Sequence, residues 1–359
     1  MTASNDTLIF VATPTIKIDG QDHERANALM IGLTMTERDG GMSALELRLT
    51  NFASDTGGAA QPVFTGDDAI ELGATIEVSA GETSNQQPIF KGKVTALEAE
   101  LSESDAPQLV VLAEDALQQA RMTRRTKVYE SVSISDLVNQ IAPNLGLSAD
   151  VASIGDEATT QVQLNESDLA FLRRVLDRND CDMQIADGQI KVTKRGDRQR
   201  GSVRLLMNQE IRRARVVADL AHQVSSVTVS GWDETQGQRV SATSSGTSFG
   251  PGSGRKGSEI LAQTVGDRAE HVGHLTAVTN SEAQAIADAA FNERARRFIS
   301  VEATTEGNAT LRVGTHVELV GLGAHFDNTY LVTSTSHQFD LENGYRTSFE
   351  AECAFWGNE

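Results

Sequence analysis

Cysteine, proline and aromatic residues are all scarce in this sequence. Its 359 residues include 2 cysteines, 6 prolines and 5% aromatics. Cys181 and Cys353 stand alone, with no CxxC pair and no even ladder of spacings. This scarcity excludes a disulfide-stapled secreted domain and indicates two packed thiols in a reducing compartment.

Long apolar runs and basic charge are lacking as well. No stretch approaches the roughly 20 apolar residues that span a bilayer, and the opening MTASNDTLIFVATP has no basic flank and no small-residue cleavage site. With 31 basic against 50 acidic residues, the net charge is −19, which repels phosphate backbones and anionic lipid. We therefore expect a cytoplasmic start, no nucleic acid partner and no membrane partner.

Short alternating strands, by contrast, are abundant. In SALELRLT, Leu45, Leu47 and Leu49 point to one face and the polar residues between them to the other. The preceding MIGLTMTERDGG predicts a strand and then a hairpin turn at DGG. The length exceeds that of one usual core, so two or three domains are expected. Residues 1–113 are predicted to be a first β-domain of roughly six or seven strands.

From residue 114 the apolar period becomes helical, and residues 114–201 are predicted to be a mixed α/β insert domain. SISDLVNQIAPNLGL fits a helix, with Ser133 and Asp136 as a capping box and Pro143 and Gly146 at its end.

The stretch NESDLAFLRRVL predicts a second helix in this region. Asn165 and Asp168, three residues apart, are expected to cap it. Phe171 lies at the margin of its apolar stripe. The stripe itself consists of Leu169, Leu172, Val175 and Leu176.

A hairpin is predicted directly after that helix, in CDMQIADGQIKV. A two-residue turn at Asp187-Gly188 places Ile185 opposite Ile190 on one face, and Met183 opposite Val192 on the same face. Cys181 shares the parity of Met183, so we expect a buried structural thiol rather than a reactive one.

Residues 202–359 return to strands and are predicted to be a second β-domain. They begin with HQVSSVTVSGWD and QRVSATSS, followed by a long, flexible Gly/Ser-rich loop at 244–258. A helix is predicted at 281–298, capped by Ser281. The buried side of this helix is expected to hold Ile286, Ala289, Ala290 and Phe298. The last hairpin should turn at Asn343-Gly344.

The last region echoes the first. LGATIEV at 72–78 matches VGTHVEL at 313–319, with Gly73 and Gly314 in the same place. A loop, a phenylalanine (Phe90 and Phe326) and a long pair of strands follow each copy. We therefore predict an α+β, mainly β fold, in which two barrel-like β-domains related by internal duplication flank the mixed α/β insert.

Two glycine patterns imitate catalytic or nucleotide-binding motifs. Gly246 to Gly250 spells G-x-S-x-G, but Pro251 and further glycines follow where a nucleophile elbow needs a helix. Gly252 to Gly257 spells G-x-G-x-x-G, without the parallel strand and βαβ unit of a dinucleotide site. Both are interpreted as chance products of a Gly-rich loop.

Histidine and acidic residues provide little more. His271 and His274 form a near pair beside Glu270, but neither HExxH nor a zinc spacing occurs. His337 has the parity of an ordinary strand histidine, and the carboxylates are too dispersed to nominate a pair. The sequence therefore predicts no catalytic, cofactor-binding or metal-binding residue, no cofactor and no enzyme.

Four segments carry a family resemblance. They are IFKGKVTALEAEL with LVVLAED; YESVSISDLVNQIAPNLGL; ESDLAFLRRVLDRNDCDMQIADGQIKV; and VTVSGWDE with the closing strands from VGTHVELVGLGAHFDNTY to EAECAF. In these the chain resembles the phage late control protein D group and is similar to the N-terminal hub part of VgrG spikes in contractile injection systems. The most specific segment is ESDLAFLRRVL.

The resemblance implies a structural baseplate hub of a phage tail or a phage-derived injection particle, assembled in the bacterial cytoplasm. Such a hub is a homotrimer with pseudo-six-fold symmetry, placed between the ring of the hexameric inner tube and a trimeric spike, and it also contacts the wedge proteins of the baseplate. The sequence ends at Glu359 without the β-helical spike of full-length VgrG, so a separate spike protein is expected. A baseplate-associated cell-wall hydrolase or peptidase is the alternative, and a secreted β-domain adhesin is a third, weakened by the missing signal peptide.

Overall fold

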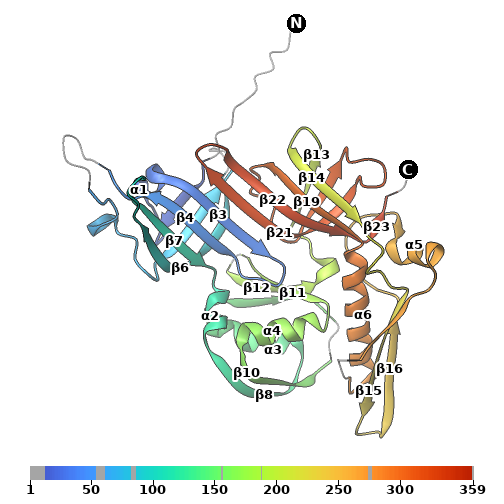
Figure 1. Ribbon diagram of the computed structural model, residues 1–359. Helices are drawn as coiled ribbons and strands as arrows, with labels where there is room; N and C mark the ends of the chain where they lie inside the picture. The colour runs from blue at the N-terminus through green and yellow to red at the C-terminus, as the bar shows by residue number, and fades with distance from the viewer. Residues whose placement is uncertain are drawn as a thin grey trace.

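The computed structural model describes residues 13–53, 61–81, 86–154, 157–186, 188–273 and 277–357. The fold is mainly β, with most of the helices below a long twisted sheet (Figure 1). Among the described residues, no helix has the length and the apolar character needed to cross a membrane.

The first part of the chain forms five neighbouring strands of this sheet, which we call the first unit. In spatial order they are β3 (Met30–Arg38), β4 (Ala44–Thr50), β7 (Gln108–Glu114), β6 (Gln87–Glu100) and β5 (Thr75–Ala80). Leu45, Leu47 and Leu49 of β4 are buried, as their alternation predicts. The sheet continues beyond β5 with β1 (Thr15–Ile18) and β2 (Gln21–Asp22). This part of the chain also contains α1 (Glu24–Leu29) and a 3-10 turn at Gly66–Asp68.

The last part of the chain forms five more strands, the second unit. In spatial order they are β14 (Ile211–Ala218), β19 (Ile299–Glu306), β22 (Gly344–Cys353), β21 (Asn328–Asp340) and β20 (Thr315–Val320). A parallel strand, β13 (Gly201–Leu206), lies beside β20. The two units join where Ser334–Asp340 of β21 pairs antiparallel with β3, so the sheet is continuous across both.

The two units match in strand order and direction, and in register except at Val78/Ser79, where β5 and β6 have a bulge without a counterpart between β20 and β21. Both contain a bulge between the long strand and its hairpin partner, and another between the first two strands. The bulges in the first unit are at Val94/Ala96 and Met30/Gly32, and those in the second unit are at Val332/Ser334 and Ile211/Arg213. Gly73 and Gly314 precede equivalent strands and share a left-handed backbone, with φ of 86° and 90°.

One detail of the predicted echo is wrong. Phe90 lies opposite Val78 in the first unit, and the residue in the matching place of the second unit, opposite Leu319, is Asn328. Phe326 lies in the turn just before β21 and not in the strand.

The middle part of the chain has its own apolar core beneath the sheet. Its elements are α2 (Leu117–Met122), β8 (Arg124–Val132), α3 (Ile134–Ile141), a 3-10 turn (Ala142–Leu145), β9 (Ser148–Val151), β10 (Thr159–Ser167), α4 (Asp168–Asp177), β11 (Cys181–Ala186) and β12 (Gln189–Lys194). The capping box of Ser133 and Asp136 is present. Gly146, with φ of 68°, ends the turn after Pro143.

The predicted hairpin register is confirmed. Ile185 lies opposite Ile190 and Met183 opposite Val192. Cys181 is completely buried in the same core. Asp187, in the predicted turn, lies outside the described residues.

The start of the α4 helix differs from the prediction. Ser167, not Asn165, is the cap, because its hydroxyl accepts the N–H of Ala170 while Asn165 still belongs to β10. Pairing of β10 with β8 continues through Ser167 and delays the helix. The predicted stripe is buried, and so are Asp168 and Phe171, which was placed only at its margin.

A further apolar core, which the sequence did not predict, is formed by the chain segment that connects the first strand of the second unit, β14, to the second, β19. It is formed by α6 (Asn280–Arg296) against β15 (Ser226–Asp233), β16 (Gln238–Ser244) and β18 (Ala269–Val272). The α6 helix is capped by Thr279 rather than Ser281, since the Thr279 hydroxyl accepts the N–H of Glu282. Of its predicted buried side chains, Ile286, Ala289 and Phe298 are buried and Ala290 only half-buried.

The Gly/Ser-rich loop at 244–258 is packed rather than free. Its Phe249 meets the ring of Phe291 edge-on, and Ser253 donates its N–H to Asn328. A Cβ on Gly254 would lie 1.8 Å from a carbonyl oxygen of Trp356, so glycine is needed there for close approach. The loop ends in β17 (Arg255–Lys256), which pairs with β23 (Phe355–Trp356), and in α5 (Gly257–Thr264).

Candidate functional site

Buried ion pairs hold the parts of the molecule together at the junction of the two units. Glu37 of β3 accepts from the Arg312 Nε at 2.7 Å and from the Arg200 Nη1 at 2.8 Å. The backbone N–H of Val313 adds a third bond at 3.2 Å. Burial by itself favours the neutral acid, but the guanidinium groups of Arg312 and Arg200 outweigh it and lower the pKa of Glu37 to about 2.

A second cluster links the β3–β4 turn to the middle part of the chain. Arg198 donates to Asp39 from that turn and to Asp182 of β11. Asp182 also accepts the N–H of Gly40 at 2.7 Å. Arg195, from a 3-10 turn at Arg195–Asp197, bridges Asp39 and Asp177.

A third cluster ties the middle part to α6 and to the second unit. Arg296 of α6 donates from Nη2 to Asp180 at 2.5 Å, and its Nε lies 3.3 Å from Glu352 of β22. The side chain of Arg296 is only 2% exposed. Its α6 neighbour Asn292 donates to the same Asp180 at 2.9 Å.

These clusters act as structural locks and not as acid–base machinery. Each buried carboxylate in them lies beside an arginine, and both oxygens of Glu37, Asp180 and Asp182 accept hydrogen bonds. Burial nevertheless raises the pKa of Asp182 to about 6 and raises that of Glu352 as well. Asp115, nearby, has a pKa raised to about 6 by burial, yet its two oxygens accept the N–H groups of Ser43 and Leu117. Both oxygens of Asp115 are thus held by backbone N–H groups, which fixes the orientation of its side chain.

The side chains singled out in the sequence do not meet in one place. Ser248, of the G-x-S-x-G pattern, lies 3.3 Å from Asp197 and has no histidine partner among its recorded contacts. His271 contacts Ser230, and His274 lies outside the described residues. The ring of His337 is buried and bonded to the Tyr345 hydroxyl at 2.7 Å, and burial lowers its pKa to about 3. In the described part of the chain, no group of three His, Cys, Asp or Glu residues could hold a metal.

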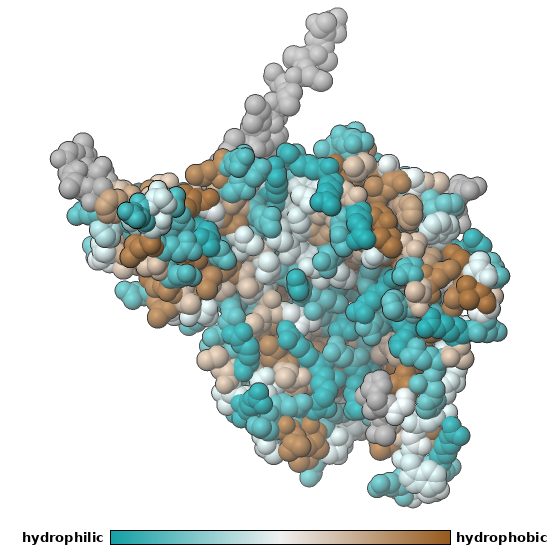
Figure 2. Space-filling view, viewed as in Figure 1, coloured by the Kyte–Doolittle hydropathy of each residue, from teal (hydrophilic) through white to brown (hydrophobic). Residues whose placement is uncertain are grey.

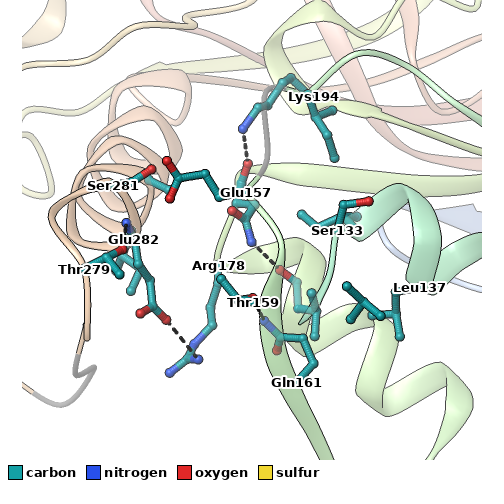
Figure 3. Close-up of a pocket in the computed structure, with 17 residues that line it drawn as sticks. Ser133, Leu137, Glu157, Thr159, Gln161, Arg178, Lys194, Thr279, Ser281 and Glu282 are labelled. Atoms are coloured by element: carbon teal, nitrogen blue, oxygen red, sulfur yellow. Dashed lines mark hydrogen bonds and ion pairs between the residues drawn. The ribbon is translucent and has the colours of Figure 1, made fainter. Parts of the chain in front are cut away.

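Two hollows are candidates for ligand sites. One lies between α3, β10, α4 and α6, where Arg178 faces Glu282 at 4.0 Å (Figure 3). Its volume of about 90 Å³ is well below the several hundred that ligand pockets need. The other, of about 990 Å³, is an open groove between β6 and the β11–β12 hairpin, with Lys91, Lys93 and Lys191 at its wall. The lining of this groove also includes Asp115 and Asp182, whose pKa values burial raises to about 6.

The exposed face of the long sheet is polar. Over β3, β21, β22 and β19 it carries hydroxyl and charged side chains, and this area is mostly teal and white in Figure 2. These side chains are Thr36, Arg38, Glu302, Thr304, Ser334, Ser336, Ser348 and Glu350. A polar sheet face of this kind can be covered by solvent or by a polar partner, and it does not favour packing against another apolar layer.

The residues that hold the junction, above all Arg198, Arg200, Arg296 and Arg312, were not nominated from the sequence. The run RGDRQR at 195–200 was the available signal, since clustered arginines beside buried strands indicate ion pairs.

Comparison with solved structures shows the fold of tail proteins. The prophage MuSo2 43 kDa tail protein from Shewanella oneidensis matches with a TM-score of 0.70 at 13% identity, over 95% of this chain and 98% of that one. A tail protein from Neisseria meningitidis MC58 matches at 0.66 and 10%, over 96% and 98%. The Escherichia coli c3393 protein, described as a component of the type VI secretion system, matches at 0.59 and 13%, over 96% and 78%.

No curated protein sequence matches this chain. The likeness to tail and VgrG structures supports the predicted resemblance at the level of fold. The family model that matches carries a different description, Alg8 N-terminal domain, and covers residues 57–340. The chain therefore belongs to the Alg8 N-terminal domain family.

Proposed function

We propose that this protein is the structural hub in the baseplate of a contractile injection machine, a phage tail or a phage-derived particle. In this role three copies form a ring with pseudo-six-fold symmetry. The ring seats the hexameric inner tube on one side and a separate trimeric spike on the other, and wedge proteins of the baseplate contact its outside. Assembly takes place in the bacterial cytoplasm.

The observation that carries the proposal is the agreement between the two units. Same strand order, same register and bulges in the same places support two copies of one module, in residues 1–113 and 202–359, with residues 114–201 inserted between them. A trimer then offers six similar modules, and heterologous contacts between them can close into a ring.

The similar structures support the same role. They include two tail proteins, one of them from a prophage, and a secretion-system component described as similar to the T4 bacteriophage tail proteins gp27 and gp5. A VgrG from Francisella, solved in complex with PdpA, shares the fold at a TM-score of 0.54. These similar structures are described as tail proteins or as a component of a secretion system, which favours a structural role over the alternative of a cell-wall hydrolase or peptidase.

Sedimentation equilibrium of the purified chain at high micromolar concentration tests the oligomer, and end-on class averages from electron cryomicroscopy test its symmetry. We expect a trimer whose end view shows six similar lobes around a central opening. Monomers or dimers alone, or a trimer with only three lobes around its opening, would contradict the hub.

A further inference from the structure

Two strand edges on opposite sides of the long sheet have no partner among the described residues. One is the second half of β6, from Ala96 onward, where β5 has already ended and only β7 is paired. The other is the outer edge of β14, where the only pairing among the described residues besides that with β19 is a single bridge from Ile211 to Met207. The two strands lie toward opposite ends of the sheet (Figure 1). Long open edges invite pairing with another chain.

The second unit shows what covers the first of these edges. Its long strand, β21, is the counterpart of β6, and its second half is paired with β3. In turn, β3 is the counterpart of β14. The contact that joins the two units inside one chain is therefore the pattern for a contact between β6 of one chain and β14 of the next.

The bulges define the register of that contact. Val94 and Val332 occupy matching bulges, so Leu101 corresponds to Phe339. Met30 and Ile211 occupy the other matching pair, so Ala214 corresponds to Leu33.

Inside the chain, Phe339 lies opposite Leu33, His337 opposite Met35 and Gln338 opposite Thr34. Transferring these three pairs to the open edges places Leu101 opposite Ala214, Ala99 opposite Val216 and Glu100 opposite Arg215.

Exposure supports the transfer. Phe339, Leu33 and Met35 are all buried where the two units meet inside the chain. Their counterparts are not: Leu101 is 78% exposed, and Ala214 and Val216 are only half-buried. The apolar side chains at the open edges thus lack the cover that the equivalent positions have.

Charge supports it as well. The open end of β6 and the turn after it carry acidic side chains, at Glu98, Glu100 and Glu103. The β14 edge carries Arg212, Arg213 and Arg215 instead. Opposite charges meet in antiparallel pairing between the two edges, whereas pairing of either edge with its own copy would bring like charges together.

We propose that β6 of one chain, from Ala96 to Ser102, pairs antiparallel with β14 of a second copy, from Asp219 back to Arg213, and that Ala99 faces Val216. This interface deepens the proposed hub and rests on it. Three copies joined in this way close eight strands from each chain, β14, β19, β22, β21, β3, β4, β7 and β6, into one continuous ring.

Cysteine cross-linking tests the register. The Ala99→Cys/Val216→Cys variant should form disulfide-linked dimers and trimers under mild oxidation. The Ala99→Cys/Ala218→Cys variant is the matched control, because it moves one thiol two residues along the same face, where the Cα atoms lie beyond the roughly 7 Å that a disulfide can bridge. Cys181 and Cys353 are buried, so the parent chain should not cross-link.

A charge swap tests the pairing without relying on disulfides. Glu100→Arg and Arg215→Glu should each weaken trimer association about tenfold, and the double variant should restore it to within about threefold of the parent. Each charge also has a partner inside its own chain, Arg48 and Glu302, so only the rescue by the double variant reports on the contact between chains.

The possible outcomes separate the two proposals. Trimers with no cross-link in the Ala99→Cys/Val216→Cys variant and no rescue in the double charge variant would overturn this interface and leave the hub standing. Equal or stronger cross-linking of the Ala99→Cys/Ala218→Cys control would overturn the register. Monomers at every concentration would overturn both the interface and the hub.

Discussion

In the first unit the chain passes from its first strand to its second through the short turn at residues 39–43, whereas in the second unit the same connection runs through residues 219–298. The strands on either side keep the same register and the same bulge. The difference shows that the length of a connection can change while the pairing of the strands stays the same. Pairing is kept because a shift of one strand by one residue would turn its core side chains outward. A whole extra core, formed on α6, fits into a connection that elsewhere is a hairpin turn.

The largest effect is expected where the two units meet. Arg312→Met should lower the free energy of unfolding by about 3 to 5 kcal/mol, because it leaves the carboxylate of Glu37 buried without its closest partner. Chemical denaturation measures this. The control is Arg204→Met, which removes an exposed ion pair with Glu318 and should change stability by about 0.5 kcal/mol or less.

Removing both partners sharpens the same test. The Glu37→Gln/Arg312→Met variant should lose less stability than the sum of its two single changes, since no uncompensated charge is left in the core. Additive losses would show that Glu37 and Arg312 stabilise the junction independently of each other.

A smaller effect on stability is expected at a pair of matching positions, one at the end of β7 and one at the end of β22. Asp115 in the first unit corresponds to Cys353 in the second, and both are buried. Because burial raises the pKa of Asp115 to about 6 from an ordinary 3.8, the folded chain holds this proton over a range where the unfolded chain has released it. Its contribution to stability is present below pH 4 and is lost as the pH rises through 6, by up to about 3 kcal/mol.

Unfolding free energies of the parent and of Asp115→Asn, measured between pH 3.5 and 7, check this contribution. The difference between the two should change across that window and level off above it. Glu37 loses its own stabilising contribution as the pH falls from about 4.5 through about 2, which overlaps the acid end of this window. Because Glu37 is present in both proteins, this loss cancels in the difference between them. Parallel curves would contradict this, because they would show that Asp115 has the same pKa in the folded and the unfolded chain.

The smallest effect concerns the two glycines of the echo. Both need a positive φ, so replacing either by alanine should cost about 1 kcal/mol. A Cβ on Gly73 meets nothing within 4 Å, whereas one on Gly314 lies 3.0 Å from the side chain of Arg198. Gly314→Ala should therefore lower the melting temperature more than Gly73→Ala. Equal shifts would show that Arg198 moves aside at no cost.

Local patterns in the sequence predicted local structure well. The alternation of Leu45, Leu47 and Leu49, the capping box at Ser133 and the hairpin that buries Cys181 all depend on residues close in the chain. Helix starts were less predictable, as at Asn165, because pairing with a distant strand decided where the helix could begin.

The long-range features were not predictable from the same patterns. The core on α6 joins segments far apart in the sequence, and its small alanines have no strong apolar signature. The arginines of the junction become informative only when burial and partners are known, since nothing in the sequence ties Arg312 to Glu37, 275 residues away. The echo of Gly73 and Gly314 was visible, but its extent required the strand register.

The insertion at residues 219–298 also bears on what a docking partner would encounter. Around a closed circle of three chains, every second module would bear this extra lobe and every other would end in a bare hairpin. The strands of such a circle would repeat six times, while its rim would repeat three times. One polypeptide would thus present a surface with sixfold symmetry to a tube and a surface with threefold symmetry to a protein that binds the outside of the ring.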